Sequence, residues 1–90
     1  MQHDTIDSRT RVQAWMVAYM ADLLDIPQEN VDVTLPFEQY GLDSAATVAF
    51  TSDLGHWINQ KLDSRLMVEF ENIDSVAGHV AEQHGASVPL

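Results

Sequence analysis

One serine offers the most specific chemistry in the chain. It closes the tetrapeptide Gly41-Leu42-Asp43-Ser44, between a long loop and an amphipathic segment. A serine at the start of a helix lies among backbone N–H groups that have no partner within the helix. The helix dipole adds partial positive charge there, so a phosphodiester on the Ser44 hydroxyl would be well placed. The alternative is that Ser44 only caps the helix, which is the commoner role of an isolated Asp-Ser pair.

The first element that must support this serine is a helix in the N-terminal third. Asp7 or Ser8 caps its start, and it ends before Ile26-Pro27, because the residue before a proline leaves the helical region. Its apolar residues recur at steps of three and four, as an amphipathic helix requires: Val12, Trp15, Met16, Tyr19, Met20 and Leu23.

A long segment, 25–42, then leads to the serine. Loops of this length are usually functional when they lack regular structure. A strand over 31–35 is conceivable, but the sequence offers it no partner strand. We therefore expect a loop that is fixed across the bundle by its apolar residues, with Gly41 forming the turn into the next helix. The expected anchors are Ile26, Val31, Val33, Leu35, Phe37, Tyr40 and Leu42.

The second helix is expected to begin at Asp43 or Ser44 and to run to about Leu62. Lys61 would then lie in the last turn, where a cation suits the helix dipole. Its buried stripe is predicted to be Val48, Thr51, Leu54, Ile58 and Leu62, with Phe50 and Trp57 on the flank.

The last helix is expected to begin at a cap formed by Asn72. Its buried face is predicted to be Ile73, Val76, Ala77, Val80 and Ala81. A short helical turn around 68–71 is expected before it. Residues 86–90 are expected to fray, as chain ends commonly do.

Composition limits the classes of function. Fourteen acidic residues against four basic ones give a net charge of −10, which argues against nucleic acid as a partner, because phosphate contacts need lysine and arginine. No apolar run approaches the roughly 18 residues of a membrane span, and the N-terminus is too polar for a signal peptide. With no cysteine, a cytosolic location is expected. The charge suits docking onto basic patches of other proteins, or serves solubility alone.

The order of these features resembles the acyl carrier protein family, the phosphopantetheine-bearing domains of fatty-acid, polyketide and nonribosomal peptide assembly. The resemblance covers about 12–83. Its most specific part is Phe37-x-x-Tyr40-Gly41-Leu42-Asp43-Ser44. The stretch 66–80 resembles the closing pattern of the family, with Asn72 in place of the usual threonine cap.

The resemblance implies an all-α antiparallel bundle of three main helices plus one short helix, with a long loop between helices one and two. It implies one domain over 1–90, with a core over about 8–84. Ser44 would carry 4′-phosphopantetheine, installed by a phosphopantetheinyl transferase from coenzyme A. The thiol of that arm would hold acyl groups as thioesters, and the chain itself would not catalyse a reaction. Asp43 would cap the helix and give the transferase a negative contact, or would act as a cap alone.

Departures from the family pattern favour a polyketide-type carrier. Asp53 is the single acid between Ser44 and Lys61, unlike the several acids of bacterial fatty-acid carriers, and Gly41-Leu42 stands where peptide carriers usually have Gly-Gly. Ala45 replaces the usual large apolar residue after the serine, which leaves less apolar surface for the transferase. The stretch 53–58 resembles an Asp-Leu-x-x-Trp-Leu sequence of polyketide carriers that receive starter acyl groups from acyl-adenylate ligases. The expected partners are the transferase and an acyl-adenylate ligase, acyltransferase or ketosynthase. They are expected to dock on Leu42, Ala45, Val48 and Asp53, together with Asp43.

Other functions are less well supported by the residues. A small helical adaptor without a covalent cofactor is the rival, and a transferase assay would separate the two. A Ser-His-Asp hydrolase would need an oxyanion hole and a cleft, and no Gly-x-Ser-x-Gly elbow is present. His79 and His84 are five residues apart, which does not align two metal ligands on a helix. Met1 and the chain length suggest a free-standing carrier, and an excised domain with an added start codon is the alternative. A monomer is expected.

Overall fold

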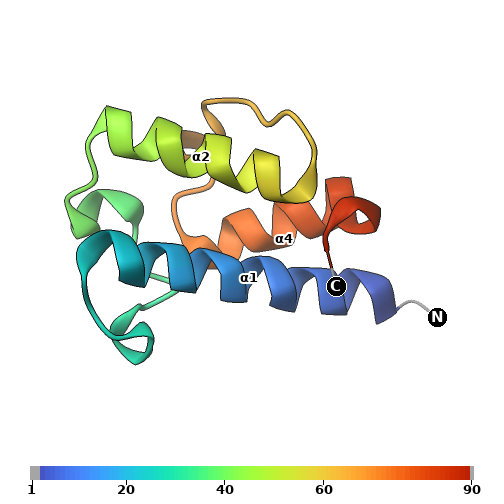
Figure 1. The fold of residues 1–90 in the computed structure, drawn as a ribbon, viewed down its shortest axis with the longest axis horizontal. Helices are drawn as coiled ribbons and strands as arrows, with labels where there is room; N and C mark the ends of the chain where they lie inside the picture. Colours follow the sequence, from blue (N-terminus) through green and yellow to red (C-terminus); the bar gives the residue numbers. More distant parts are fainter. Residues whose placement is uncertain (1–2, 90) are drawn as a thin grey trace.

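The computed structural model describes residues 3–89, with side chains described over 8–89. The three main helices are α1 (His3–Leu24), α2 (Ser44–Ile58) and α4 (Ile73–His84). The 3-10 helices η1 (Gln28–Asn30) and η2 (Phe37–Tyr40) lie between α1 and α2, the short α3 (Leu66–Glu69) lies between α2 and α4, and the 3-10 helix η3 (Gly85–Ser87) follows α4. In Figure 1, α1 runs opposite to both α2 and α4. The expected bundle of three main helices and one short helix is confirmed, and the described residues form no strand.

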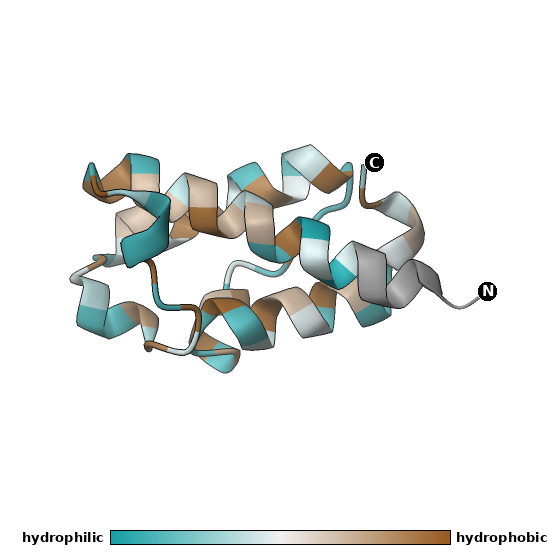
Figure 2. Cartoon of the chain, turned by 90° about the horizontal axis from the view of Figure 1, so that it is seen from below, coloured by the Kyte–Doolittle hydropathy of each residue, from teal (hydrophilic) through white to brown (hydrophobic). Residues whose placement is uncertain are grey.

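The core lies between the three main helices. It contains Val12, Met16 and Met20 of α1, Phe50, Leu54 and Ile58 of α2, and Ile73, Val76 and Val80 of α4, all with no exposed surface. Leu66, Met67, Phe37 and Val88 close its edges. Polar and apolar residues alternate along each helix in Figure 2. Among the described residues, no helix is both long enough and apolar enough to cross a bilayer.

The expected start of α1 is wrong. The helix is already formed at His3, so positions 7 and 8 lie inside it, and the side chain of Asp7 is outside the described part. Ser8 is buried, and its hydroxyl donates a hydrogen bond to the Gly85 carbonyl at 3.0 Å. The first turns of α1 therefore gain a tertiary partner in η3, which the sequence pattern did not reveal.

The C-terminal segment is ordered by the same contact, against the expectation that 86–90 fray. Residues 85–87 form η3, and Val88 is buried in the core. Leu90 lies outside the described residues. Burial of one large apolar side chain stabilises a fold by about 1.5–3 kcal/mol, which suffices to hold a short tail.

Both α1 and α2 end at a residue with left-handed backbone geometry. Asp25 (φ 57°) follows α1, and the N–H of Ile26 donates to the Ala21 carbonyl at 3.0 Å. Asn59 (φ 57°) follows α2 in the same way, and the N–H of Gln60 donates to the Gly55 carbonyl at 3.0 Å. These bonds satisfy carbonyls that a helix end leaves without partners.

The end of α2 at Ile58 corrects the prediction of about Leu62. Lys61 therefore lies in the connection after the helix and not in its last turn. The buried stripe is also rotated: Phe50 is fully buried, whereas Val48 is 50% exposed. Thr51, Leu54 and Ile58 are buried as expected, and Trp57 lies on the flank.

The α4 prediction is confirmed in full. Asn72 accepts a hydrogen bond from the N–H of Ser75 at 2.7 Å, and all five predicted apolar residues are buried. The short α3 precedes it, two residues earlier than expected.

The loop over 25–42 is fixed across the bundle, as expected. Phe37 is buried, and its N–H donates to the Glu71 carbonyl at 2.8 Å. The N–H of Asp74 donates to the Val33 carbonyl at 3.0 Å. These bonds join the middle of the loop to the start of α4, so the segment ahead of Ser44 is held against the bundle.

Candidate functional site

The turn into α2 sets the position of Ser44. Gly41 has φ 80°, a left-handed conformation that favours glycine. A Cβ added there would meet no atom within 4 Å, so the backbone angle and not crowding accounts for the glycine. Leu42 then packs against the core and fixes the chain at the next residue. The turn therefore delivers residues 43 and 44 to the surface at the end of the bundle where α2 begins (Figure 1).

Asp43, and not Ser44, caps α2. Its carboxylate accepts a hydrogen bond from the N–H of Ala46 at 2.8 Å, and its backbone is extended. Its carbonyl accepts from both the N–H and the hydroxyl of Thr47, each at 3.0 Å. The capping interpretation of Ser44 is therefore excluded by geometry, because its neighbour already fills that position.

The Ser44 hydroxyl is left free. The residue is exposed, and its hydroxyl forms no hydrogen bond with any residue that the structure describes. The N–H groups of Ser44 and Ala45 also lack partners in the described part of the chain. A phosphate ester on this hydroxyl would lie beside two free N–H donors at the positive end of a helix dipole. The residues present therefore fit a phosphate-linked group.

The surface around Ser44 is partly apolar. Ala45 is exposed, and Val48 lies one helical turn further along the same face of α2. Val68 of α3 is 65% exposed nearby in the fold. A hollow of about 290 Å³ lies between η2, α2 and α3, with Leu42, Met67 and Val68 in its wall and Glu38 and Glu71 beside them. Of the docking residues expected from the sequence, Ala45 and Val48 are exposed and Leu42 is half-buried.

The fourth expected docking residue, Asp53, is bound to α1. Its carboxylate accepts a hydrogen bond from the Tyr19 hydroxyl at 2.6 Å. One turn further along α2, Trp57 stacks on Trp15 with ring centroids 5.3 Å apart. Burial, and then the hydrogen bond and the charge of Asp53, raise the pKa of Tyr19 to about 12. Asp53 and Trp57 thus join two helices within the protein, although the Asp53 side chain stays exposed.

Comparison with known proteins identifies the family. The sequence pattern of the family described as "Phosphopantetheine attachment site" matches residues 14–80, most of the chain. The chain belongs to the acyl carrier protein family. It is 33% identical over 70 residues to acyl carrier protein TtuC of Teredinibacter turnerae, a match covering 78% of this chain and 80% of TtuC. The family carries 4′-phosphopantetheine, and its members are carriers, not enzymes.

Larger proteins contain related segments. The chain is 30% identical over 79 residues to polyketide synthase ThaG of Burkholderia thailandensis; the match covers 88% of this carrier and 1% of that synthase. A free-standing peptidyl carrier protein from Acinetobacter baumannii has the same fold, with a TM-score of 0.79 at 21% identity, covering 84% of this carrier and 95% of that chain. The low identity of that structure makes it evidence for the fold alone.

The histidines of this carrier form no metal site in the described part. No group of three or more histidine, cysteine or acidic residues there could hold an ion. His79 instead stacks on Phe70 with centroids 4.3 Å apart. A hydrolytic role for Ser44 gains no support either, because no described histidine forms a hydrogen bond with its hydroxyl.

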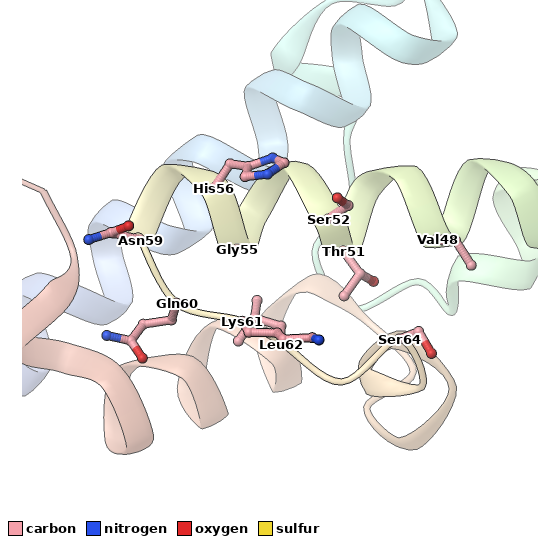
Figure 3. Close-up of a pocket in the computed structure, with 10 residues that line it drawn as sticks. All are labelled: Val48, Thr51, Ser52, Gly55, His56, Asn59, Gln60, Lys61, Leu62 and Ser64. Atoms are coloured by element: carbon pink, nitrogen blue, oxygen red, sulfur yellow. The ribbon is translucent and has the colours of Figure 1, made fainter.

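Sequence reasoning missed a groove along α2. The groove has a volume of about 450 Å³ and lies between α2 and the connection 59–64. Figure 3 shows Val48 and Thr51 projecting from α2 toward this connection, which carries Lys61, Leu62 and Ser64. Because the helix was predicted to continue through Lys61, the connection could not be expected to fold back. Asn59, a residue that tolerates left-handed geometry, was the one available signal.

Proposed function

We propose that this carrier holds acyl intermediates as thioesters on a 4′-phosphopantetheine arm attached to Ser44. In the attachment reaction, the Ser44 oxygen attacks the phosphorus of coenzyme A that bears the pantetheine. The new bond joins the serine oxygen to that phosphorus, the pyrophosphate bond breaks, and adenosine 3′,5′-bisphosphate leaves. The serine proton passes to a base of the transferase. The thiol at the end of the arm then supplies the thioester chemistry.

The single observation that carries this proposal is that Asp43 caps α2 while the hydroxyl of the adjacent Ser44 remains free. Asp43 takes the cap position, so the neighbouring Ser44 hydroxyl is exposed and free of hydrogen bonds within the described chain. A serine used as the cap would have to break a hydrogen bond before reacting, at a net cost of about 0.5–1.5 kcal/mol. Ser44 carries no such cost.

We place the carrier in polyketide assembly. The support is that several similar proteins, including ThaG and polyketide synthase PksL of Bacillus subtilis, are polyketide synthases. Enzymes of such an assembly would act on the cargo as acyltransferases or ketosynthases. Loading by an acyl-adenylate ligase is the finer proposal, and it rests on the resemblance of residues 53–58. It is tested by supplying the phosphopantetheinylated carrier with ATP, a carboxylic acid and such a ligase, and measuring the added acyl mass.

Partners are proposed to dock over the start of α2. Ala45, Val48 and Val68 offer exposed apolar area, and the hollow beside Leu42 can receive an apolar side chain. Glu38 and Glu71 beside that hollow, with a net charge of −10, favour a partner whose apolar contact is ringed by lysine or arginine. The Asp53 carboxylate contributes less freely, because Tyr19 already donates to it.

The decisive experiment is incubation with coenzyme A and a broad-specificity phosphopantetheinyl transferase, followed by intact mass measurement. The native chain is expected to gain one phosphopantetheinyl unit, and Ser44→Ala none. Ser52→Ala is the matched control, because it removes another exposed serine of α2 and should leave modification unchanged. An unmodified native chain would favour the rival function, a helical adaptor without a covalent cofactor.

A further inference from the structure

The hydroxyl of Tyr40 connects two separate points of the loop over 25–42. It accepts a hydrogen bond from the N–H of Asp32 at 2.8 Å and donates one to the Asp32 carbonyl at 2.6 Å. A phenol has a single proton to donate, and here that proton is used on the same residue whose N–H the oxygen accepts. The Tyr40 ring is half-buried and packs against the core, whereas Asp32 is exposed. We call these two hydrogen bonds the Tyr40 clamp.

The turn that the clamp holds is itself joined to α4. The Asp32 carboxylate accepts hydrogen bonds from the N–H and from the hydroxyl of Thr34, at 2.9 and 2.7 Å. The Val33 carbonyl accepts a hydrogen bond from the N–H of Asp74, in the first turn of α4, at 3.0 Å. The Tyr40 hydroxyl is therefore connected, through one closed turn, to a main helix of the bundle.

The clamp acts on the weakest part of the chain ahead of Ser44. Tyr40 is the last residue of η2, a short 3-10 helix with no side-chain cap at its start, and 3-10 hydrogen bonds have poorer geometry than those of an α-helix. The next residue is Gly41, and glycine loses more conformational freedom on folding than any other residue. Leu42 and Asp43 hold the chain after this glycine. The clamp holds it before the glycine, so the turn into α2 is fixed from both sides.

The hydroxyl adds order to the loop and not apolar packing. A phenylalanine at position 40 would keep the ring against the core but could form neither bond of the clamp. Because Asp32 is exposed, water can take the place of the lost hydroxyl, and the net loss is that of ordinary hydrogen bonds. Removal of the hydroxyl should therefore loosen the loop while the bundle stays folded.

We propose that Tyr40 is a positioning residue for the modification of Ser44, and that its hydroxyl keeps residues 41–44 ordered before the transferase binds. This inference rests on the proposed attachment at Ser44 and adds a residue that prepares the site. A surface that is ordered in advance loses less freedom on binding, so the clamp acts on the KM of the carrier. The kcat does not depend on it, because the Ser44 hydroxyl and coenzyme A react in the same way once both are bound.

The first test compares the native chain and Tyr40→Phe as substrates of a broad-specificity phosphopantetheinyl transferase. Coenzyme A is in excess, all proteins are kept below their unfolding temperatures, and the product is measured by intact mass. One hydrogen bond of ordinary net strength changes an equilibrium about two- to twelve-fold. We expect the KM of Tyr40→Phe to rise by about this factor, with kcat at the native value.

The second test measures amide hydrogen exchange in the unmodified proteins by 1H–15N NMR. The N–H of Asp32 loses its partner in Tyr40→Phe and should exchange faster. The N–H of Gly41, which donates to the Glu38 carbonyl at 3.1 Å, should also exchange faster, because the end of η2 loosens with the clamp. The N–H of Val80, a buried residue of α4, should keep its native exchange rate.

Val88→Ala is the matched control for a general loss of stability. Val88 is buried and follows η3. This segment lies beside the end of α2, far from its start, because the Gln60 amide donates to the Ser87 hydroxyl at 2.9 Å. The substitution leaves a cavity and should lower Tm, but it should leave KM and the exchange of Asp32 and Gly41 at native values.

Four results would overturn the proposal: an unchanged KM in Tyr40→Phe, a loss confined to kcat, native exchange at Asp32 and Gly41, or equal rises of KM in Tyr40→Phe and Val88→Ala. A native chain that gains no phosphopantetheinyl unit would instead overturn the attachment at Ser44. The two failures are distinguishable, because the exchange measurement needs no modification and still shows whether the clamp orders the turn.

Discussion

Replacing Asp43 with asparagine separates the two roles expected of this side chain. Asparagine caps helices about as well as aspartate, so Asp43→Asn should keep the bond from the Ala46 N–H, which is 2.8 Å long in the structure. It loses only the interaction of a charge with the helix dipole, about 0.3–1 kcal/mol. Asp43→Ala also loses the cap, which costs about 0.5–2 kcal/mol.

These magnitudes convert into melting temperatures. In a domain of this size, 1 kcal/mol shifts Tm by about 4–8 °C. If Asp43→Asn costs about 0.5 kcal/mol and Asp43→Ala about 1.5 kcal/mol, values within these ranges, Tm should fall by about 2–4 °C and by about 6–12 °C in thermal unfolding followed by circular dichroism. A wild-type Tm for Asp43→Ala would refute the capping argument.

The same variants report on recognition by the transferase. At a temperature where all variants are folded, Asp43→Asn should be modified more slowly than the native chain if the carboxylate contacts the enzyme. Asp22→Asn is the control for net charge, because Asp22 is an exposed residue of α1. If Asp43→Asn and Asp22→Asn are both modified at the native rate, capping is the sole role of Asp43.

Three further predictions concern the stability of the helical bundle. Gly55→Ala should lower Tm although alanine favours helices, because its Cβ would lie 2.7 Å from the Gln60 carbonyl oxygen, a backbone atom, and such overpacking costs about 1–3 kcal/mol. Gly78→Ala should raise Tm by up to about 8 °C. The atom nearest to the added Cβ, at 3.3 Å, is the flexible end of Arg9, and the helix gains up to about 1 kcal/mol. A rise in Tm for Gly55→Ala, or a fall for Gly78→Ala, would contradict the contact argument. The raised pKa of Tyr19 predicts a loss of stability as pH rises from about 10, the pKa in the unfolded chain, to about 12, the pKa in the folded protein. A group with a raised pKa stabilises the fold fully at pH values below its unfolded-state pKa, and this stabilisation is lost as pH rises through its folded-state pKa. Denaturant unfolding of the unmodified protein across this pH range should show a smaller loss of unfolding free energy in Tyr19→Phe than in the native chain. An equal loss in both proteins would contradict the attribution to Tyr19.

Much of the site could be predicted because its signals are local. The glycine at 41 specifies a left-handed turn, and the acid at 43 lies where a helix cap belongs. The apolar residues of the loop over 25–42 indicated anchoring, and Phe37 is buried as expected. What local reasoning left open was which of two adjacent residues caps α2. The hydrogen bond of Asp43 decides this, and with it the availability of Ser44.

The sequence by itself determined that three amphipathic helices form, in which order, and that a serine follows a cap-forming residue at the start of the second. Caps, turns and apolar spacing act over one or two helical turns, so they are readable along the chain. Only the tertiary structure decided that Phe50 and not Val48 faces the core, because the buried arc of a helix depends on where its neighbours pack. It also decided that α2 stops at Ile58 and that Val88 is buried. Each of these depends on contacts between residues far apart in the sequence, and the groove beside Lys61 exists because of them.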